Sequence, residues 1–436
     1  MTRSHVGPLR RSGLARECDC GVAGRMTRVA AAVGSPLRAF LHAESAGGLV
    51  LVAAAAGALV WANSPAAEGY AQFWHQTLTI GGSAGISLDL QHWVNDGLMA
   101  VFFFVIGLEI KRELVVGELR DRRAAMLPAL AAVGGVVLPA VIYLALAGRG
   151  ESADGWGVPM ATDIAFAVGI LALLGRHAST GAKLFLLSVA IVDDILAIVV
   201  IAVFYSDHLS LWWLAAAVAG LLVTVGMRRI GVNSPWAYVP VGVMVWFATL
   251  ESGVHATLAG VALGLLVPAR PVAGRDVLDD LERSLHPVSA FLVIPIFALA
   301  NAGLDLRGGV LGDAFGQPLT WAVIAGLIVG KFIGIAGVTV LIRRLGWGSL
   351  PGDMHHREIL GVAALGGVGF TVSLFITDLA FTSAALIGQA KVGILTASVV
   401  AAILGAALLL GAPAGTGSSR SSPPGSDSSR AVDPRR

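Results

Sequence analysis

Charged residues are scarce in this chain of 436 residues. They make up 13% of the sequence, against roughly 25% in soluble domains, while hydrophobic residues reach 56% and the mean hydropathy is +0.78. Such a chain cannot cover a water-facing surface of its size with charged groups, which excludes an ordinary soluble enzyme. The apolar content also excludes disorder for most of the length. The net charge of +2 is too small to indicate nucleic-acid binding.

Cysteines are almost absent. The two that occur, Cys18 and Cys20, are one residue apart, with no neighbouring ligands to complete a zinc site. The fold therefore depends on no disulfide framework. The chain also lacks a glycine loop ending in Gly-Lys-Ser or Gly-Lys-Thr, so that no nucleotide and no metal cofactor is expected.

Long hydrophobic runs are abundant instead. A helix needs about 20 mostly apolar residues to cross a bilayer, and the runs are too long for the strands of a membrane barrel. The pattern predicts an all-α polytopic membrane protein with twelve transmembrane helices. The predicted spans are 46–62, 93–116, 126–147, 157–175, 183–205, 209–227, 235–250, 254–268, 287–304, 319–342, 357–377 and 386–411.

The loops between these spans alternate in positive charge. Every second loop, starting with 111–123, is rich in Lys and Arg, and these loops hold 15 such residues against 2 in the others. Positive residues resist translocation and remain cytoplasmic. Twelve spans with both termini in the cytoplasm is the interpretation that fits this alternation, and it predicts a multi-pass protein of a bacterial cytoplasmic (inner) membrane.

The two ends differ from the middle. Residues 1–30 have many arginines and no uninterrupted apolar core before a cleavage site, so we expect residues 1–44 to form a partly disordered cytoplasmic leader rather than a signal peptide. Met26 is an alternative start of the protein. Residues 412–436 are rich in Gly, Ser and Pro and are expected to form a disordered cytoplasmic tail. The transmembrane domain is expected at 45–411.

Ionisable residues inside a membrane are costly and indicate function. Asp193 and Asp194 lie in the middle of the fifth predicted span, Asp163 in the fourth and Lys331 in the tenth, while His255 opens the eighth. Repulsion and desolvation of two adjacent carboxylates favour protonation of at least one near neutral pH, and their oxygens suit a hard cation. A site able to hold protons or a cation is what ion exchange requires. A structural ion pair with Lys331 is the alternative interpretation of the aspartates.

Helix-breaking residues interrupt two spans. Pro159 and the Thr162–Asp163 pair fall at the start of the fourth span, and Gly366, Gly367 and Gly369 fall within the eleventh. Irregular backbone survives in a membrane only where it lines a cavity or is buried in protein. The fourth and eleventh helices are therefore predicted to be discontinuous, as at the ion sites of transporters.

Six stretches of the sequence resemble those of the NhaA-type sodium/proton antiporters. They are WVNDGLMAVFFFVIGLEIKREL (93–114), ATDIAFAVGILALLG (161–175), VAIVDDILAI (189–198), SGVHATLAG (252–260), PIFALANAG (295–303) and LIVGKFIGI (327–335). The resemblance covers roughly residues 45–410. It implies the inverted-repeat antiporter fold of that family.

The resemblance also implies roles for individual residues. Asp193 and Asp194 would form the cation and proton site, with transient Na⁺ or Li⁺ binding, and Thr162 would supply a hydroxyl nearby. Asp163 and Lys331 would neutralise the ends of the broken helices. A cytoplasmic pH-response set would comprise Glu109, Arg112, Glu113, Glu282, His286 and His255.

Two departures from the family pattern affect the expected regulation and assembly. Arg283 stands where the best-studied family pattern has a histidine, which predicts a shifted pH response. The stretch 75–92 resembles the family's outward β-hairpin, a homodimer contact, and here contains GGSAG.

The sequence thus predicts a secondary antiporter that expels Na⁺ or Li⁺ in exchange for H⁺. If both carboxylates release a proton for each cation, two protons enter per sodium and the cycle is electrogenic. The partner of the protein is the lipid bilayer. The alternative is a sodium-coupled organic-solute symporter on a related fold, which would need a larger solute cavity.

Overall fold

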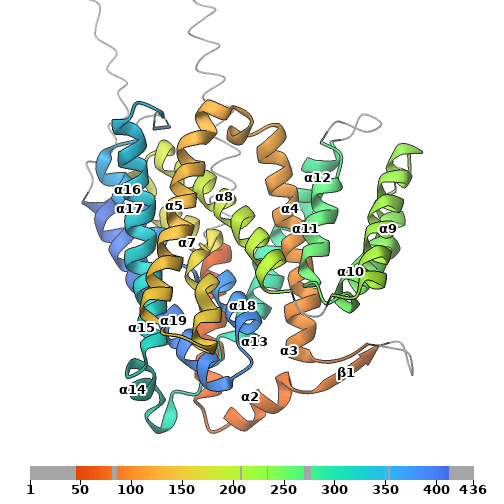
Figure 1. Cartoon of the computed structure of the whole chain (residues 1–436), viewed down its shortest axis with the longest axis horizontal. Helices are drawn as coiled ribbons and strands as arrows, with labels where there is room; N and C mark the ends of the chain where they lie inside the picture. The colour runs from red at the N-terminus through yellow and green to blue at the C-terminus, as the bar shows by residue number, and fades with distance from the viewer. Residues whose placement is uncertain are drawn as a thin grey trace, which may run out of the picture.

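The structure, a computed structural model, describes residues 46–80, 86–206, 209–232, 234–269, 276–348, 350–351 and 354–411. The predicted leader (1–44) and tail (412–436) lie outside these residues, as does the GGSAG sequence at 81–85. The described part of the chain is predominantly helical, in agreement with the predicted all-α class (Figure 1).

The helices follow the predicted spans closely, with several spans divided into shorter elements. The first half of the chain contains the helix Ala46–Ala62, α2 (Ala67–Trp74), α3 (Leu90–His92), α4 (Met99–Val115), α5 (Arg122–Leu146), α6 (Glu151–Asp154), α7 (Ile164–Leu174), α8 (Thr180–Phe204), α9 (Leu211–Arg229) and α10 (Pro235–Glu251). The second half contains α11 (Thr257–Leu266), α12 (Val277–Val288), α13 (Ile294–Asn301), α14 (Val310–Phe315), α15 (Pro318–Ala325), α16 (Lys331–Arg344), α17 (His356–Leu365), α18 (Phe370–Ala380) and α19 (Ala384–Leu410).

Short segments of tighter or wider helix complete the list. The 3₁₀ turns are η3 (Glu118–Arg120), η4 (Gly155–Met160), η5 (Gly175–His177) and η7 (Arg307–Gly309). Three wider, π-helical segments are η2 (Trp93–Leu98), η6 (Ser289–Val293) and η8 (Gly326–Gly330). Each π segment lies inside a predicted span. Such segments are rare and often mark functional sites.

Seven helices among the described residues are long and apolar enough to cross a membrane, or up to nine if each of two bent helix pairs counts as one span. One of these pairs joins α17 to α18 at an angle of 40°. The other joins the helix Ala46–Ala62 to α2, which turns away by 115°. The protein is therefore a multi-pass membrane protein, and the count of twelve spans stays a prediction.

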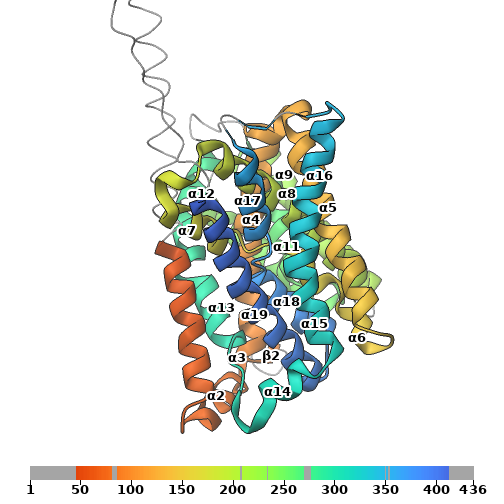
Figure 2. The same ribbon diagram turned by 90° about the vertical axis from the view of Figure 1, so that its left-hand side faces the viewer.

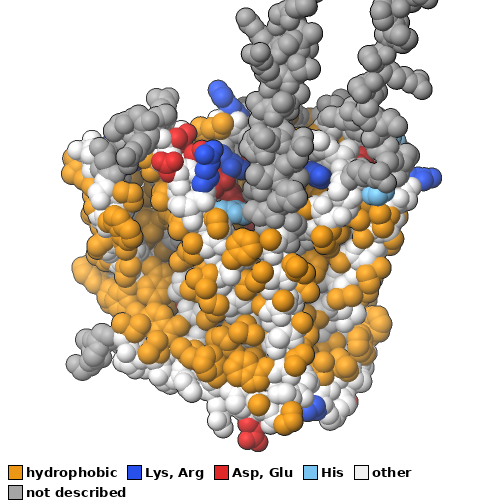
Figure 3. Space-filling view, turned by 180° about the vertical axis from the view of Figure 1, so that it is seen from behind, with side chains coloured by type: hydrophobic (Ala, Val, Ile, Leu, Met, Phe, Trp, Pro, Cys, Tyr) orange, Lys and Arg blue, Asp and Glu red, His pale blue; other side chains and the backbone are white. Residues whose placement is uncertain are grey.

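The surface has the pattern of a protein embedded in lipid. Figure 3 shows a broad band of hydrophobic side chains, with Lys, Arg, Asp and Glu side chains gathered mainly at one end of the molecule. The helices α9 and α10 form a hairpin at the edge of the molecule in Figure 1. Trp212 and Trp236 are the second residues of α9 and α10, and they are 79% and 82% exposed. Because the two helices are antiparallel, these rings lie at opposite ends, as tryptophans do at the two membrane interfaces.

Close packing of α5 against α16 places Lys331. A Cβ atom on Gly334 would lie 2.2 Å from the Gly134 carbonyl oxygen, so only glycine allows the two backbones to approach this closely. Lys331 is one turn before Gly334 and is completely buried. In Figure 2, α19 crosses the face of the molecule beside α17 and α15, which it contacts along its length.

A buried carboxylate joins the starts of α8 and α17. Glu358 accepts hydrogen bonds from the backbone N–H groups of Ser179 (2.7 Å) and His355 (2.7 Å), which precede the two helices. The first N–H groups of a helix have no partner within the helix, and an acceptor there stabilises both helix starts. Glu358 thus fixes the relative position of two helices that lead into the candidate site.

The only sheet among the described residues is a two-stranded antiparallel hairpin of β1 (Thr77–Ile80) and β2 (Ile86–Asp89). Its register pairs Thr77 with Asp89 and Ile80 with Ile86. The hairpin projects sideways at the end of the molecule opposite the label of α12 (Figure 1). The predicted hairpin at 75–92 is therefore present, and we call this end of the molecule the hairpin end.

Candidate functional site

The two adjacent aspartates lie in the middle of α8. Asp193 and Asp194 are 1% and 5% exposed, and the helix around them is an apolar run that ends in Phe204. Consecutive residues of a helix point in directions about 100° apart. The two carboxylates therefore face different surroundings, although sequence alone treats them as one pair.

Asp193 forms an ion pair with Lys331 and contacts Thr162. The ammonium group of Lys331 donates a hydrogen bond to Asp193 Oδ2 and another to the Thr162 hydroxyl oxygen at 3.0 Å. The Thr162 hydroxyl lies 2.7 Å from Asp193 Oδ2 and 2.9 Å from the Gly366 carbonyl oxygen, and its single proton serves one of them at a time. The sequence-predicted residues Thr162, Asp193 and Lys331 are thus in direct contact.

Two interruptions of the helices meet beside this ion pair. Residues 161–163 separate η4 from α7, and residues 366–369 separate α17 from α18. The Asp163 N–H donates to the Val368 carbonyl oxygen at 2.7 Å, which joins the two non-helical segments. A Cβ atom on Gly367 would lie 2.5 Å from the Leu327 carbonyl oxygen, so the crossing requires glycine there.

Asp163 caps two helices at this crossing. Its Oδ1 accepts from the Phe166 N–H at the start of α7 (3.0 Å), and its Oδ2 accepts from the Thr371 N–H (3.0 Å) and hydroxyl (2.8 Å) at the start of α18. Helix N-termini carry partial positive charge, which a carboxylate offsets. Thr371 was not identified from the sequence.

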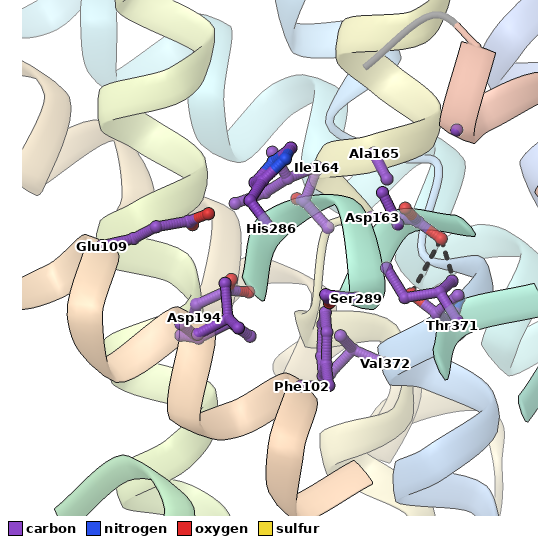
Figure 4. A pocket seen from close by; sticks show the side chains of 16 residues that line it. Phe102, Glu109, Asp163, Ile164, Ala165, Asp194, His286, Ser289, Thr371 and Val372 are labelled. Atoms are coloured by element: carbon purple, nitrogen blue, oxygen red, sulfur yellow. Dashed lines mark hydrogen bonds between the residues drawn. The ribbon is translucent and has the colours of Figure 1, made fainter. Parts of the chain in front are cut away.

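Asp194 faces a pocket rather than the ion pair. The pocket is also lined by Glu109 of α4, Asp163, His286 of α12 and Thr371. Figure 4 shows the side chains of Glu109, His286 and Asp194 around this space, with Asp163 bonded to Thr371 on its far side. We call it the Asp194 pocket. The two aspartates therefore have different surroundings: Asp194 lines this pocket, whereas Asp193 is bonded to Lys331.

Most of the predicted pH-response residues lie beside this pocket. Arg112 of α4 forms an ion pair with Glu282 of α12 and lies 3.9 Å from the Glu113 carboxylate. The second carboxylate oxygen of Glu282 is buried and accepts no hydrogen bond within the described part of the chain. Together with the pocket residues Glu109 and His286, these groups form one cluster between α4 and α12.

His255 is not part of that cluster. Its Nε2 contacts the carbonyl oxygen of Tyr205 at the end of α8. Glycines of α11 meet α4 near Ala100 and Phe104, so the two helices run alongside each other and His255 lies near the start of α4. Arg112 is near the other end of α4, about 20 Å further along the helix. The structure therefore separates His255 from the other predicted pH-response residues.

Two features of the structure were not predicted from the sequence: the π segments and the buried Lys391. The π segment η8 ends at Gly330, directly before Lys331, and η6 contributes Ser289 to the Asp194 pocket. No simple sequence pattern predicts such segments. Lys391 is the second: it lies within the predicted span 386–411, is 7% exposed, and pairs with Asp378. The rule that singled out Lys331, an ionisable residue inside an apolar run, identifies Lys391 equally well.

The chemistry of the site suits a small cation and protons. Asp193 and Asp194 each have a buried oxygen, Oδ1, that accepts no hydrogen bond from the residues that the structure describes. A buried polar atom without a partner is costly, and an ion or a proton removes the cost. Carboxylate and hydroxyl oxygens are ligands for hard cations.

A multi-pass helical membrane protein whose buried carboxylates and lysine meet where two helices are interrupted belongs to the class of ion transporters. A family model described as Na⁺/H⁺ antiporter 1 matches residues 38–409. The chain belongs to this family, and the predicted membership of the NhaA-type antiporters is confirmed.

Individual relatives agree over most of the chain. The Na(+)/H(+) antiporter NhaA 3 of Frankia alni is 46% identical over 89% of this chain and 90% of its own length. The NhaA of Mesorhizobium japonicum is 48% identical over 87% and 96% of the two lengths. The NhaA 2 of Pseudomonas putida is 44% identical over 87% and 94%.

Proposed function

We propose that this Na⁺/H⁺ antiporter exchanges sodium or lithium ions for protons at Asp193 and Asp194. The observation that carries the proposal is that Asp194 lines a pocket while its neighbour Asp193 is held by Lys331 and Thr162. Membership of the Na⁺/H⁺ antiporter family supports it. The activity is transport rather than enzymatic catalysis, and we expect it to need no cofactor.

Competition for the same oxygens couples the two ions. A cation that enters the Asp194 pocket needs ionised carboxylates, so its binding expels protons, and protonation in turn releases the cation. Asp193 becomes available to a cation only when Lys331 moves away from it. Thr162 then supplies a hydroxyl oxygen beside Asp193. If each carboxylate releases one proton per sodium, the exchange is two for one and electrogenic.

We propose that the non-helical crossing allows ions to reach the site from both sides of the membrane. We infer that the fourth and eleventh of twelve membrane spans are discontinuous at residues 161–163 and 366–369, within an inverted-repeat fold. Asp163 at two helix N-termini is consistent with a role in offsetting partial positive charge. Lys331 donates hydrogen bonds to the side chains of Thr162 and Asp193, and its effect on the negative helix ends is part of the proposal.

The orientation follows from the distribution of charge. The end bearing Arg112 is proposed to face the cytoplasm and the hairpin end the outside, with both termini inside, in a bacterial inner membrane. The cluster of Glu109, Arg112, Glu113, Glu282 and His286 would then line the cytoplasmic entrance and set the pH response. The exposed first strand of the hairpin, β1, suits a contact between two copies of the chain.

A single assay tests the exchange and its main alternative. Everted membrane vesicles containing the protein are loaded with a pH-sensitive dye, energised, and given Na⁺, Li⁺ or K⁺ at a series of pH values. Dequenching on addition of Na⁺ or Li⁺ is expected without any organic solute. Uptake of an organic solute driven by sodium, without proton flux, would instead identify a symporter.

A further inference from the structure

A second buried lysine–aspartate pair lies at the other end of α18. Asp378 is in the last turn of α18 and Lys391 is in α19, with 3.6 Å between Lys391 Nζ and Asp378 Oδ1. The two side chains are 14% and 9% exposed. Charges buried to this degree are costly unless they are paired, so the pair is a designed feature of the packing.

A chain of amides extends this pair across two further helices. Asn95, in the π segment η2, donates to Asp378 Oδ2 at 3.3 Å. Asn301 of α13 donates to Asn95 Oδ1 at 2.8 Å, and Gln91 donates to Asn301 Oδ1 at 2.9 Å. The end of α18 is therefore tied to α19, η2 and α13 at once. Such networks fix one arrangement of the helices that they join.

The two ends of α18 have matching electrostatic arrangements. At its N-terminus, the carboxylate of Asp163 from outside the helix offsets the positive end. At its C-terminus, the partial negative charge and the Asp378 carboxylate repel each other, and Lys391 offsets both. An 11-residue helix is about 16 Å long and behaves as one short rod. A change in the anchor at one end therefore moves the other.

We propose that Asp378 and Lys391 are positioning residues for ion exchange. They hold the second end of α18 and so set where Thr371, at the first end, meets Asp163 in the wall of the Asp194 pocket. This inference rests on the proposed function of that pocket. In the described part of the chain, Asp378 and Lys391 bond to each other and to Asn95 rather than to Asp193 or Asp194, so their effect is on geometry rather than on ion ligation.

The test is the sodium dependence of proton flux in the full-length protein. Lys391→Ala is expected to raise the apparent KM for sodium by about 3- to 10-fold, the range for coupling through a packed network, with a smaller change in maximal flux per folded molecule. Lys391→Arg keeps the charge and should restore the wild-type KM. Asp378→Asn should raise the KM as well, and the double variant should show non-additive effects.

The matched control is the exposed pair of Asp305 and Arg307 near the same end. Hydrogen bonds from the Arg307 side chain and N–H lower the pKa of Asp305 to about 2, so the pair stays charged throughout the assayed pH range. It has no bond to α18 among the described contacts. Asp305→Asn should leave the KM for sodium unchanged.

A purely structural role for the pair predicts a different result. The proposal would be overturned if Lys391→Ala lowered the amount of folded protein but left the KM for sodium at the wild-type value. It would also be overturned if Lys391→Arg had the same raised KM as Lys391→Ala. If Lys391→Ala does not fold, Lys391→Met, which keeps the aliphatic part of the side chain, is measured with the same expectation. Asp194→Asn distinguishes the two proposals. Sodium-driven proton flux in that variant would refute the exchange site itself. If Asp194→Asn is inactive but Lys391→Ala keeps the wild-type KM for sodium, only the positioning role is refuted.

Discussion

Among the residues that the structure describes, two lysine–aspartate pairs lie largely buried, and they differ in their surroundings. Lys331 and Asp193 are 0% and 1% exposed, and a second carboxylate, Asp194, follows directly in the sequence. Lys391 and Asp378 are somewhat more exposed, and their other neighbour is the amide of Asn95. The first pair therefore lies beside an excess negative charge facing a pocket, which suits a site that exchanges ions. The second pair is balanced, which suits a fixed anchor.

The largest difference between the two regions is expected on removing a carboxylate. Asp194→Asn should reduce exchange to background, because asparagine is nearly isosteric but neither carries a proton nor holds the charge of a cation. Asp378→Asn should retain exchange with a raised KM. The measurement is dye dequenching on adding sodium, normalised to folded protein in the membrane. Sodium-driven proton flux above background in Asp194→Asn would show that the carboxylate facing the pocket is not essential.

Removing the lysine of the first pair should impair both transport and stability. Lys331→Ala leaves Asp193 buried without its partner, and breaking a buried pair typically costs about 3–5 kcal/mol. The midpoint of thermal unfolding in detergent is expected to fall. Lys331→Arg keeps the charge with a different geometry and should be less destabilising. An alanine variant as stable as the wild type would mean that the pair contributes nothing to the fold.

A buried carboxylate outside both pairs provides a third comparison. Glu358→Ala removes the acceptor for two N–H groups at the starts of α8 and α17, each worth about 1–3 kcal/mol if left unsatisfied. We expect a lower unfolding midpoint with near-normal flux per folded molecule, and Glu358→Gln should be milder. Loss of flux in a stable Glu358→Ala protein would indicate that this end of the helices takes part in transport.

The smallest effect is expected at an exposed charge. The histidine-to-arginine departure at Arg283 predicts a shifted pH response, and a fixed positive charge near His286 on the same helix would disfavour protonation of that histidine. In the structure, Arg283 pairs with Asp279 at 2.7 Å and its side chain is 77% exposed. Exposed pairs contribute about 0.2–1 kcal/mol, and 1.36 kcal/mol corresponds to about one pH unit, so Arg283→His should move the midpoint of activation upward by less than about 0.7 pH unit. A larger shift in the pH profile of sodium-induced dequenching would place Arg283 among the determinants of the set point.

The sequence predicts which residues form the candidate site better than it predicts which of them contact one another. Apolar runs locate the helices, and an ionisable residue inside such a run is conspicuous, so the sequence alone identifies Asp163, Asp193, Asp194 and Lys331 as candidate site residues. Which aspartate meets Lys331 depends on helix rotation and on the packing of α5 against α16, which no local pattern encodes. The π segments arise from the same tertiary packing. The family resemblance places His255 among the pH-response residues, whereas in the structure it lies near the opposite end of α4 from Arg112.

The separation of the site residues along the chain has a consequence for biogenesis. Lys331 follows its partner Asp193 by 138 residues, and Thr371 follows Asp163 by 208. At about 5–20 residues per second, roughly 7–28 s of synthesis separate the Asp193 carboxylate from the lysine that neutralises it. During that interval the nascent α8 must hold its aspartates protonated or hydrated. Insertion of the later helices then completes the site. The charge of Asp193 is therefore neutralised by Lys331 only once most of the chain has been inserted.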